Sequence, residues 1–107
     1  MSLDRLPERE PDPGEVLTEE LVAEDDVLVK AFYLGPGAAV EPHEHADSTN
    51  VFHVFEGTVA VIRGEDEREE DVEAPAVVLN ERGVKHGARN DGDEVAVFTA
   101  SLCPLPS

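Results

Sequence analysis

Short apolar segments rich in β-branched and aromatic residues recur along this chain, and glycine, proline or charged residues separate them. Their spacing is the roughly 8–12 residues that strands show in all-β sandwiches and barrels. The sequence therefore predicts an all-β fold built from short strands. The expected strands span residues 27–34, 38–45, 50–55, 58–62, 76–79 and 94–102.

Residues 14–24 form the one stretch that also admits a helix. Its apolar residues are Val16, Leu17, Leu21 and Val22. Their period fits a helix and a strand equally well, so both interpretations stay open.

Residues 65–71, EDEREED, form a dense run of charge between two of the expected strands. Such runs are usually solvated, so we expect an exposed hairpin tip. A calcium loop would need spaced ligands and a turn glycine, and the run has neither.

The chain has 107 residues, an ordinary size for one domain. Residues 1–14 combine Pro7, Pro11, Pro13 and Gly14 with charged residues, which is typical of a flexible or extended arm. We expect residues 15–107 to form a single barrel domain.

Acidic residues dominate the composition: 25 Asp and Glu stand against 8 Lys and Arg, giving a formal net charge of -17. Phosphate backbones and anionic lipids repel such a chain, so we expect neither nucleic-acid nor membrane binding. The surface resembles those of cytoplasmic proteins from extreme halophiles, where salt screens the repulsion between carboxylates. A merely acidic, very soluble protein is the alternative.

The single cysteine, Cys103, cannot form an internal disulfide, which fits the reducing cytoplasm. No apolar stretch approaches the ~20 residues needed to span a bilayer, and the acidic N-terminus does not resemble a signal peptide. We therefore expect a cytoplasmic protein.

Three of the four histidines suggest a metal site. His43 and His45 form an H-x-H pair, and residues two apart on a strand point to the same face. His86 supplies a third imidazole that a closed barrel can bring opposite the pair. Three imidazoles with open coordination positions suit a catalytic type of metal site. We expect one divalent transition metal, and Fe, Zn, Ni, Mn and Cu are the candidates.

Glycines and asparagines flank these histidines at fixed spacings. The two patterns are Gly37-x5-His43-x-His45-x4-Asn50-x6-Gly57 and Gly83-x2-His86-x3-Asn90. Together they resemble the two motifs of the cupin superfamily. The resemblance covers residues 27–102 and implies a double-stranded β-helix, a jelly-roll barrel of about six to eight strands with a metal in its mouth.

The sequence departs from the cupin pattern at Asn50, where the family usually has a metal-binding glutamate. With that glutamate a divalent ion would keep a local charge of about +1, whereas three neutral imidazoles leave about +2. Such a site should attract a small anionic ligand and hold its metal less tightly. Pro75 and Glu81 replace a usual glycine and proline, which mainly affects the shape of a turn.

A three-histidine site of this kind resembles the cupin branch of thiol and diketone dioxygenases, which use ferrous iron. If the chain is an enzyme, we expect a non-haem iron dioxygenase, with an isomerase of a sugar or keto acid as the second choice. A non-catalytic cupin module that binds a small molecule or a metal is the alternative. A cupin that has lost its metal is the third interpretation, and Asn50 points to it.

Two further residues are candidates for the metal or its surroundings. We expect Asn50 to make a hydrogen bond beside the site rather than to coordinate directly. His53 lies three residues later, so strict alternation turns it away from the side of Asn50. A bulge would bring His53 inward, and otherwise it packs on the outer face or in an interface.

Four residues are candidates for the pocket wall. Phe52 and Val54 share the face of Asn50, Tyr33 can offer a hydroxyl, and Arg89 can pair with a carboxylate of a substrate or of a nearby glutamate. Lys30 interrupts an apolar strand face. We expect it to be an edge-strand lysine that deters aggregation, since an inward lysine would be an unusual anion anchor.

The family resemblance also implies a homodimer, because the open edges of a jelly roll need cover. Each chain carries a net charge of -17, so we expect the dimer to weaken at low salt.

Overall fold

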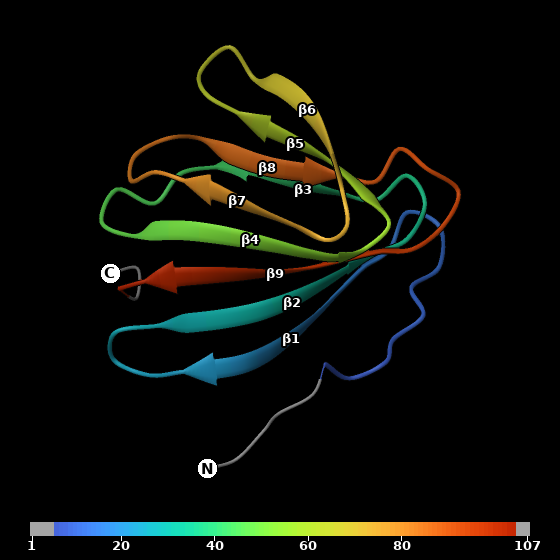
Figure 1. Ribbon diagram of the computed structural model, residues 1–107, viewed down its shortest axis with the longest axis horizontal. Coiled ribbons are helices and arrows are strands. Elements are labelled where there is room, and N and C mark those ends of the chain that lie inside the picture. Colours follow the sequence, from blue (N-terminus) through green and yellow to red (C-terminus); the bar gives the residue numbers. More distant parts are fainter. Residues whose placement is uncertain (1–5, 105–107) are drawn as a thin grey trace.

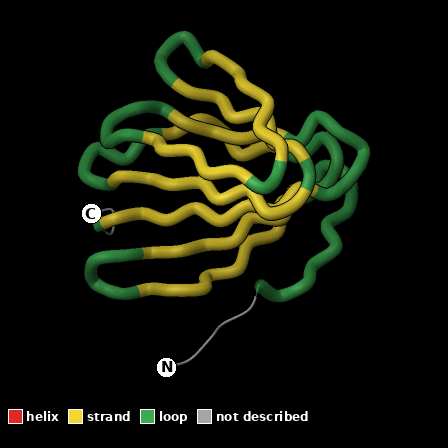
Figure 2. Tube along the Cα trace, viewed as in Figure 1, coloured by secondary structure: helices red, strands yellow, loops and turns green. Residues whose placement is uncertain are grey.

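The computed structural model describes residues 6–104, and this part of the chain forms nine strands and no helix (Figures 1 and 2). The expected all-β jelly-roll architecture is confirmed. The described residues therefore contain no helix that could cross a membrane. The strands are β1 (Val16–Ala23), β2 (Leu28–Leu34), β3 (Ala39–His43), β4 (Thr49–Glu56), β5 (Thr58–Arg63), β6 (Arg68–Glu73), β7 (Ala76–Asn80), β8 (His86–Arg89) and β9 (Ala96–Cys103).

The strands form two antiparallel sheets. One sheet has the order β1-β2-β9-β4-β7, and the other has the order β3-β8-β5-β6. Strands that are distant in sequence therefore lie side by side, as β9 does between β2 and β4 (Figure 1). This crossover pattern brings the two histidine motifs together, because β3 pairs with β8.

The hydrophobic core lies between the two sheets. The five-stranded sheet contributes Phe52, Val54 and Phe98, and the four-stranded sheet contributes Val59 and Val61. Alternation along β4 explains this placement, because Phe52 and Val54 are buried while the intervening residues face outward. On the inner face of β4 and β9, Phe52, Val54, Phe98, Ala100 and Leu102 thus form an apolar layer, with Asn50 as a buried polar residue at one end.

The structure decides between the two interpretations of one segment and differs from the sequence-based expectation at two others. The ambiguous stretch at residues 14–24 contains strand β1, which pairs with β2. The charged run at residues 65–71 is only partly a hairpin tip, since β6 begins at Arg68 and pairs with β5. The side chains of β6 are exposed apart from the half-buried Val72, so this strand shows almost no alternation of apolar and polar residues. The short strand β8 was also not expected.

The segment before β1 follows the surface of the barrel without forming a strand. The Tyr33 hydroxyl donates a hydrogen bond to the carbonyl of Pro7 at 2.6 Å, and Arg9 pairs with Glu19. A side chain at Gly35 would lie 2.0 Å from the carbonyl oxygen of Asp12, so glycine allows this close crossing. Residues 1–5 of the expected N-terminal arm lie outside the described residues.

Candidate metal centre

The structure brings together the three histidines that the motif spacing singled out. His43 ends β3, His45 follows two residues later, and His86 begins β8. One ring nitrogen from each lies within 4.8 Å of those of the other two. The ring centroids of His43 and His86 are 4.8 Å apart, and those of His43 and His45 are 4.9 Å apart. No other such cluster of potential metal ligands occurs within residues 6–104.

Strand pairing explains why His86 meets the H-x-H pair. His43 lies directly opposite His86 in the register of β3 and β8. The next residue, Gly87, allows the two strands to approach closely. A Cβ atom there would lie 2.7 Å from the carbonyl oxygen of Val40 and 2.9 Å from the backbone nitrogen of Pro42. Any larger residue would therefore push β3 away from β8 and separate the histidines.

Backbone carbonyls orient two of the imidazoles. The Nδ1 atom of His43 lies 2.8 Å from the carbonyl oxygen of Glu41, and that of His86 lies 3.2 Å from the carbonyl oxygen of Val84. A carbonyl can only accept, so we assign the ring proton to Nδ1, which leaves a lone pair on Nε2. The Nε2 atom of His86 is buried and has no hydrogen-bond partner among the described residues. A buried ring nitrogen that has no hydrogen-bond partner and lies close to two other imidazoles is what a metal ligand would look like.

The local environment favours the neutral form of His45 and His86. The pKa of His86 is lowered to about 4, chiefly by burial and to a smaller extent by the neighbouring His43 and His45, against the opposing effect of the hydrogen bond to the Val84 carbonyl. Burial, followed by the proximity of His43, also lowers the pKa of His45. His86 is therefore unprotonated at neutral pH and can offer its lone pair to a cation.

The donor set fits a divalent transition metal. Three imidazoles suit Zn, Fe, Ni and Cu, whereas Mn favours oxygen ligands. His43 is exposed and His45 is half-buried, so solvent and small molecules can reach the cluster. No carboxylate belongs to the cluster, so a bound ion would keep its full positive charge.

Asn50 lies beside the histidines but its amide oxygen is already engaged. The side chain is 2% exposed, and its Oδ1 accepts a hydrogen bond from Nδ2 of Asn80 at 2.9 Å. The two asparagines are directly opposed in the register of β4 and β7. Asn80 was not predicted from the sequence, because an asparagine at the end of an apolar run gives no recognisable signal.

A cavity of about 270 Å³ opens beside the three histidines. Its walls are mostly apolar and come from both sheets. The rings of Phe32 and Phe98 stack with centroids 5.0 Å apart, and Phe52 packs on Phe98 at 4.9 Å. The ring of Phe52 also lies 5.7 Å from that of His86. The histidines thus form the polar part of an aromatic-walled pocket.

The other candidates for the site lie in different places. Phe52 and Asn50 line the cavity, whereas Val54 belongs to the core and is absent from the wall. Tyr33 is buried on the opposite face of its sheet, with its hydroxyl on Pro7. Arg89 pairs with Glu69 and Asp91 on the four-stranded sheet.

The structure does not bring His53 to the cluster. The side chain is exposed on the outer face of β4, and its ring centroid lies 6.1 Å from that of Phe55. The register shift in β4 falls between Val54 and Glu56, after His53, so it does not turn this residue inward.

Lys30 occupies a different position from the one expected. β2 is an interior strand because β1 forms the edge of the sheet. Lys30 shares the inner face of β2 with Leu28 and Phe32, and all three line the cavity. The expectation of an edge-strand lysine was therefore wrong.

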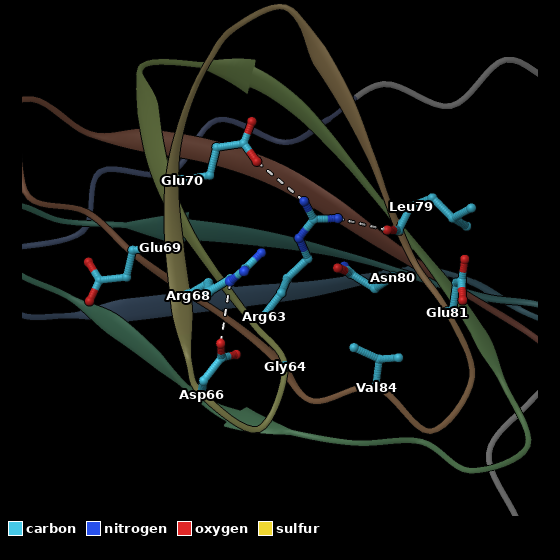
Figure 3. A pocket seen from close by; sticks show the side chains of 10 residues that line it. All are labelled: Arg63, Gly64, Asp66, Arg68, Glu69, Glu70, Leu79, Asn80, Glu81 and Val84. Atoms are coloured by element: carbon cyan, nitrogen blue, oxygen red, sulfur yellow. Dashed lines mark hydrogen bonds and ion pairs between the residues drawn. The ribbon is translucent and has the colours of Figure 1, made fainter.

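A second hollow, of about 610 Å³, lies between the β5–β6 hairpin and β7 (Figure 3). Arg63 donates to the carbonyl of Leu79 at 3.4 Å and pairs with Glu70 at 3.3 Å. Arg68 pairs with Asp66 at 3.3 Å. These charges compensate one another, so the smaller cavity at the histidines is the better candidate site despite its size.

Comparisons with solved structures agree with the fold. A structure from Thermus thermophilus is 25% identical, covers 90% of each chain and superposes with a TM-score of 0.80. An RmlC-like cupin protein from Desulfovibrio desulfuricans is 18% identical, with 97% of this chain and 96% of that one covered and a TM-score of 0.82. A predicted oxalate decarboxylase from Thermotoga maritima is 22% identical over 92% of each chain, with a TM-score of 0.78.

A comparison with curated proteins found no match. The family model described as a cupin domain matches residues 31–102, which include β3, β8 and all three clustered histidines. This match extends over most of the chain, and together with the two-sheet barrel it shows that the chain belongs to the cupin family.

Proposed function

We propose that this cupin holds one divalent transition metal through His43, His45 and His86 and binds a small anionic molecule beside it. The orphaned, buried Nε2 atom of His86 at the meeting point of the three rings carries the proposal. A buried polar atom without a partner is costly, and a bound cation would compensate that cost.

The charge of the site supports an anionic ligand. Three neutral imidazoles would leave a divalent ion at about +2, and Asn50 replaces the carboxylate that would reduce it. The bound ion would supply Lewis-acid or oxygen-binding chemistry at its open positions. The protein's own part is to orient two imidazoles through the carbonyls of Glu41 and Val84 and to provide apolar walls that exclude water.

The lining residues favour oxygen-dependent chemistry over proton-transfer chemistry. Among the described residues, Lys30 is the only titratable one in the cavity wall apart from the three histidines. An isomerase needs a group that removes a proton and returns it, and no carboxylate of residues 6–104 lines this cavity to do so. We therefore place a dioxygenase-type reaction first, an isomerase second, and a non-catalytic binding module as the alternative.

Metal content and ligand exchange test this function. Protein purified without chelators, or reconstituted anaerobically with Fe²⁺, Zn²⁺, Ni²⁺, Mn²⁺ or Cu²⁺, should hold one ion per chain. Azide should shift the visible spectrum of Co²⁺-loaded protein, because an exchangeable position remains open. Absence of stoichiometric metal would refute the metal site, and a spectrum unaffected by azide would favour a structural ion. Oxygen uptake with a panel of carboxylates and thiols separates the dioxygenase from the binding module.

The outer face of the five-stranded sheet supports the proposed homodimer. Phe55, Val77 and Leu79 are 50%, 64% and 52% exposed on neighbouring strands β4 and β7. With Val51 and His53 they form a surface patch, which we call the β4–β7 face, and Glu56 at the end of β4 borders it. Two chains of charge -17 repel one another least where few acidic side chains lie, so a second copy is the partner that this mostly apolar face suits.

Salt should control this dimer. We expect sedimentation velocity to show mostly monomer at 10 mM KCl and mostly dimer at 1 M KCl, because the Debye length falls from about 30 Å to about 3 Å over this range. Leu79→Asp should leave a monomer at both concentrations. An oligomeric state that ignores both salt and this substitution contradicts the interface. A strong dependence on salt would also support a cytoplasm of high ionic strength as the protein's environment.

A further inference from the structure

Lys30 is the one feature of the cavity that the metal site does not explain. It lines the cavity with the three histidines, although the chain as a whole carries a net charge of -17. Its neighbours on the same strand face, Leu28 and Phe32, are apolar. A leucine or methionine would continue this wall without placing an ammonium group in it.

No ion pair within the described residues uses this ammonium group. The five salt bridges involve Arg9, Arg63, Arg68 and Arg89 only. Glu20 lies directly opposite Lys30 in the register of β1 and β2, but it is exposed and forms no salt bridge with it. The half-buried lysine therefore lines the cavity without an ion-pair partner among the described residues.

Register places Lys30 across the cavity floor from the histidines. Ala100 of β9 lies opposite both Lys30 of β2 and Phe52 of β4. The Cα atoms of Lys30 and Phe52 are thus separated by two strand spacings, about 10 Å. The ring of Phe52 contacts that of His86 at 5.7 Å, and the small side chain of Ala100 leaves the space between open.

We propose that Lys30 is a second anion contact and that the ligand is a short aliphatic dicarboxylate. This inference rests on the proposed metal-dependent function. One carboxylate would face the ion at the histidines, and the other would accept a hydrogen bond from the Lys30 ammonium. The apolar spacer would lie over Ala100 and against the phenylalanine rings. A lysine serves as such a contact because its flexible stem lets the ammonium group reach a single oxygen.

The test compares each dicarboxylate with its own monoamide. The probes are malonate, succinate and glutarate with malonamate, succinamate and glutaramate, each titrated into Zn²⁺-loaded protein by calorimetry at fixed ionic strength. For the length that spans the cavity, the wild type should bind the dicarboxylate about 10- to 100-fold more tightly than the monoamide, as expected for one charge-assisted hydrogen bond. In Lys30→Met this ratio should fall to about 1 while the metal content stays unchanged.

Controls separate a local contact from long-range charge and from misfolding. Arg68→Met removes the same charge from an exposed ion pair on β6, so it should leave the ratio at its wild-type value. Lys30→Gln keeps a polar side chain and checks that any loss does not come from repacking. If Lys30 serves only a cross-strand pair with Glu20, the ratio in Lys30→Met will equal that of the wild type, and the inference is wrong.

The inference and the proposed function can fail separately. Stoichiometric zinc with no dicarboxylate preference overturns the role of Lys30 and leaves the metal site intact. If the protein takes up no metal, butyrate and butyramide are compared on the metal-free protein. A preference for butyrate that Lys30→Met removes would then support the anion contact and refute the metal site. Equal binding of the two probes would refute both.

Discussion

Replacing His86 by alanine should lower the affinity for Zn²⁺ or Fe²⁺ by at least about 100-fold. Changing a residue that only orients a metal ligand already costs about 10- to 100-fold, and this substitution removes a ligand outright. The two remaining histidines, His43 and His45, are the more exposed members of the cluster. Isothermal titration with a competing chelator measures the affinity, and elemental analysis measures the ion retained through purification.

His53→Ala provides the matched control, because this histidine is exposed on the outer face of the same barrel. It should retain one ion per chain at wild-type affinity. Equal metal content in His86→Ala and His53→Ala would mean that the three rings do not hold the ion. The site would then have to be sought outside the cluster.

Acid unfolding of metal-free protein supplies a second readout for His86. Its pKa is about 4 in the folded chain and about 6.5 when unfolded, so the unfolded state binds the proton first as the pH falls. Stability is therefore fully present above pH 6.5 and is lost between pH 6.5 and 4, by on the order of 3 kcal/mol. His86→Ala should lack most of this loss. If His86→Ala loses as much stability between pH 6.5 and 4 as the wild type does, His86 is solvated in the metal-free protein.

The histidine cluster was predictable because each of the two motifs that contribute to it is a local sequence pattern, although pairing of β3 with β8 brings them together. His43 and His45 lie two residues apart, and the glycines and asparagines around them and around His86 match a known pattern. Most strands were predictable for the same reason. Buried and exposed residues alternate along β4, and β9 is a nearly continuous apolar segment. A strand could therefore be predicted wherever its own residues show which of its faces is buried.

The elements that were missed depend on pairing between distant segments. The strand β6 has only Val72 partly buried, so nothing in its own sequence distinguishes it from a solvated loop. Asn80 matters because β7 pairs with β4 and sets it against Asn50. Lys30 was assigned to an edge because the sequence does not reveal that β1 and β9 flank β2. Sheet order, which fixes all three, is not a local property.

Phe98→Ala should destabilise the protein by about 3–5 kcal/mol, the range typical of removing a buried phenylalanine ring. Phe98 is 1% exposed, and it contacts the rings of Phe32 and Phe52 from the middle of the five-stranded sheet. Phe55→Ala, a change of the same chemistry at a side chain that is 50% exposed, should cost less than about 1 kcal/mol. Urea unfolding of the metal-free proteins compares the two.

Protein concentration separates core packing from assembly in this experiment. Phe55 belongs to the β4–β7 face, so any effect of Phe55→Ala that arises from dimer loss should disappear on dilution. The effect of Phe98→Ala should not depend on concentration, because the ring lies between the sheets of one chain. Phe98 also borders the cavity, so its removal enlarges a space that water can enter from the histidine side. A cost near 1 kcal/mol would mean that the aromatic floor collapses readily, and the rigid apolar pocket proposed for the ligand would then not exist.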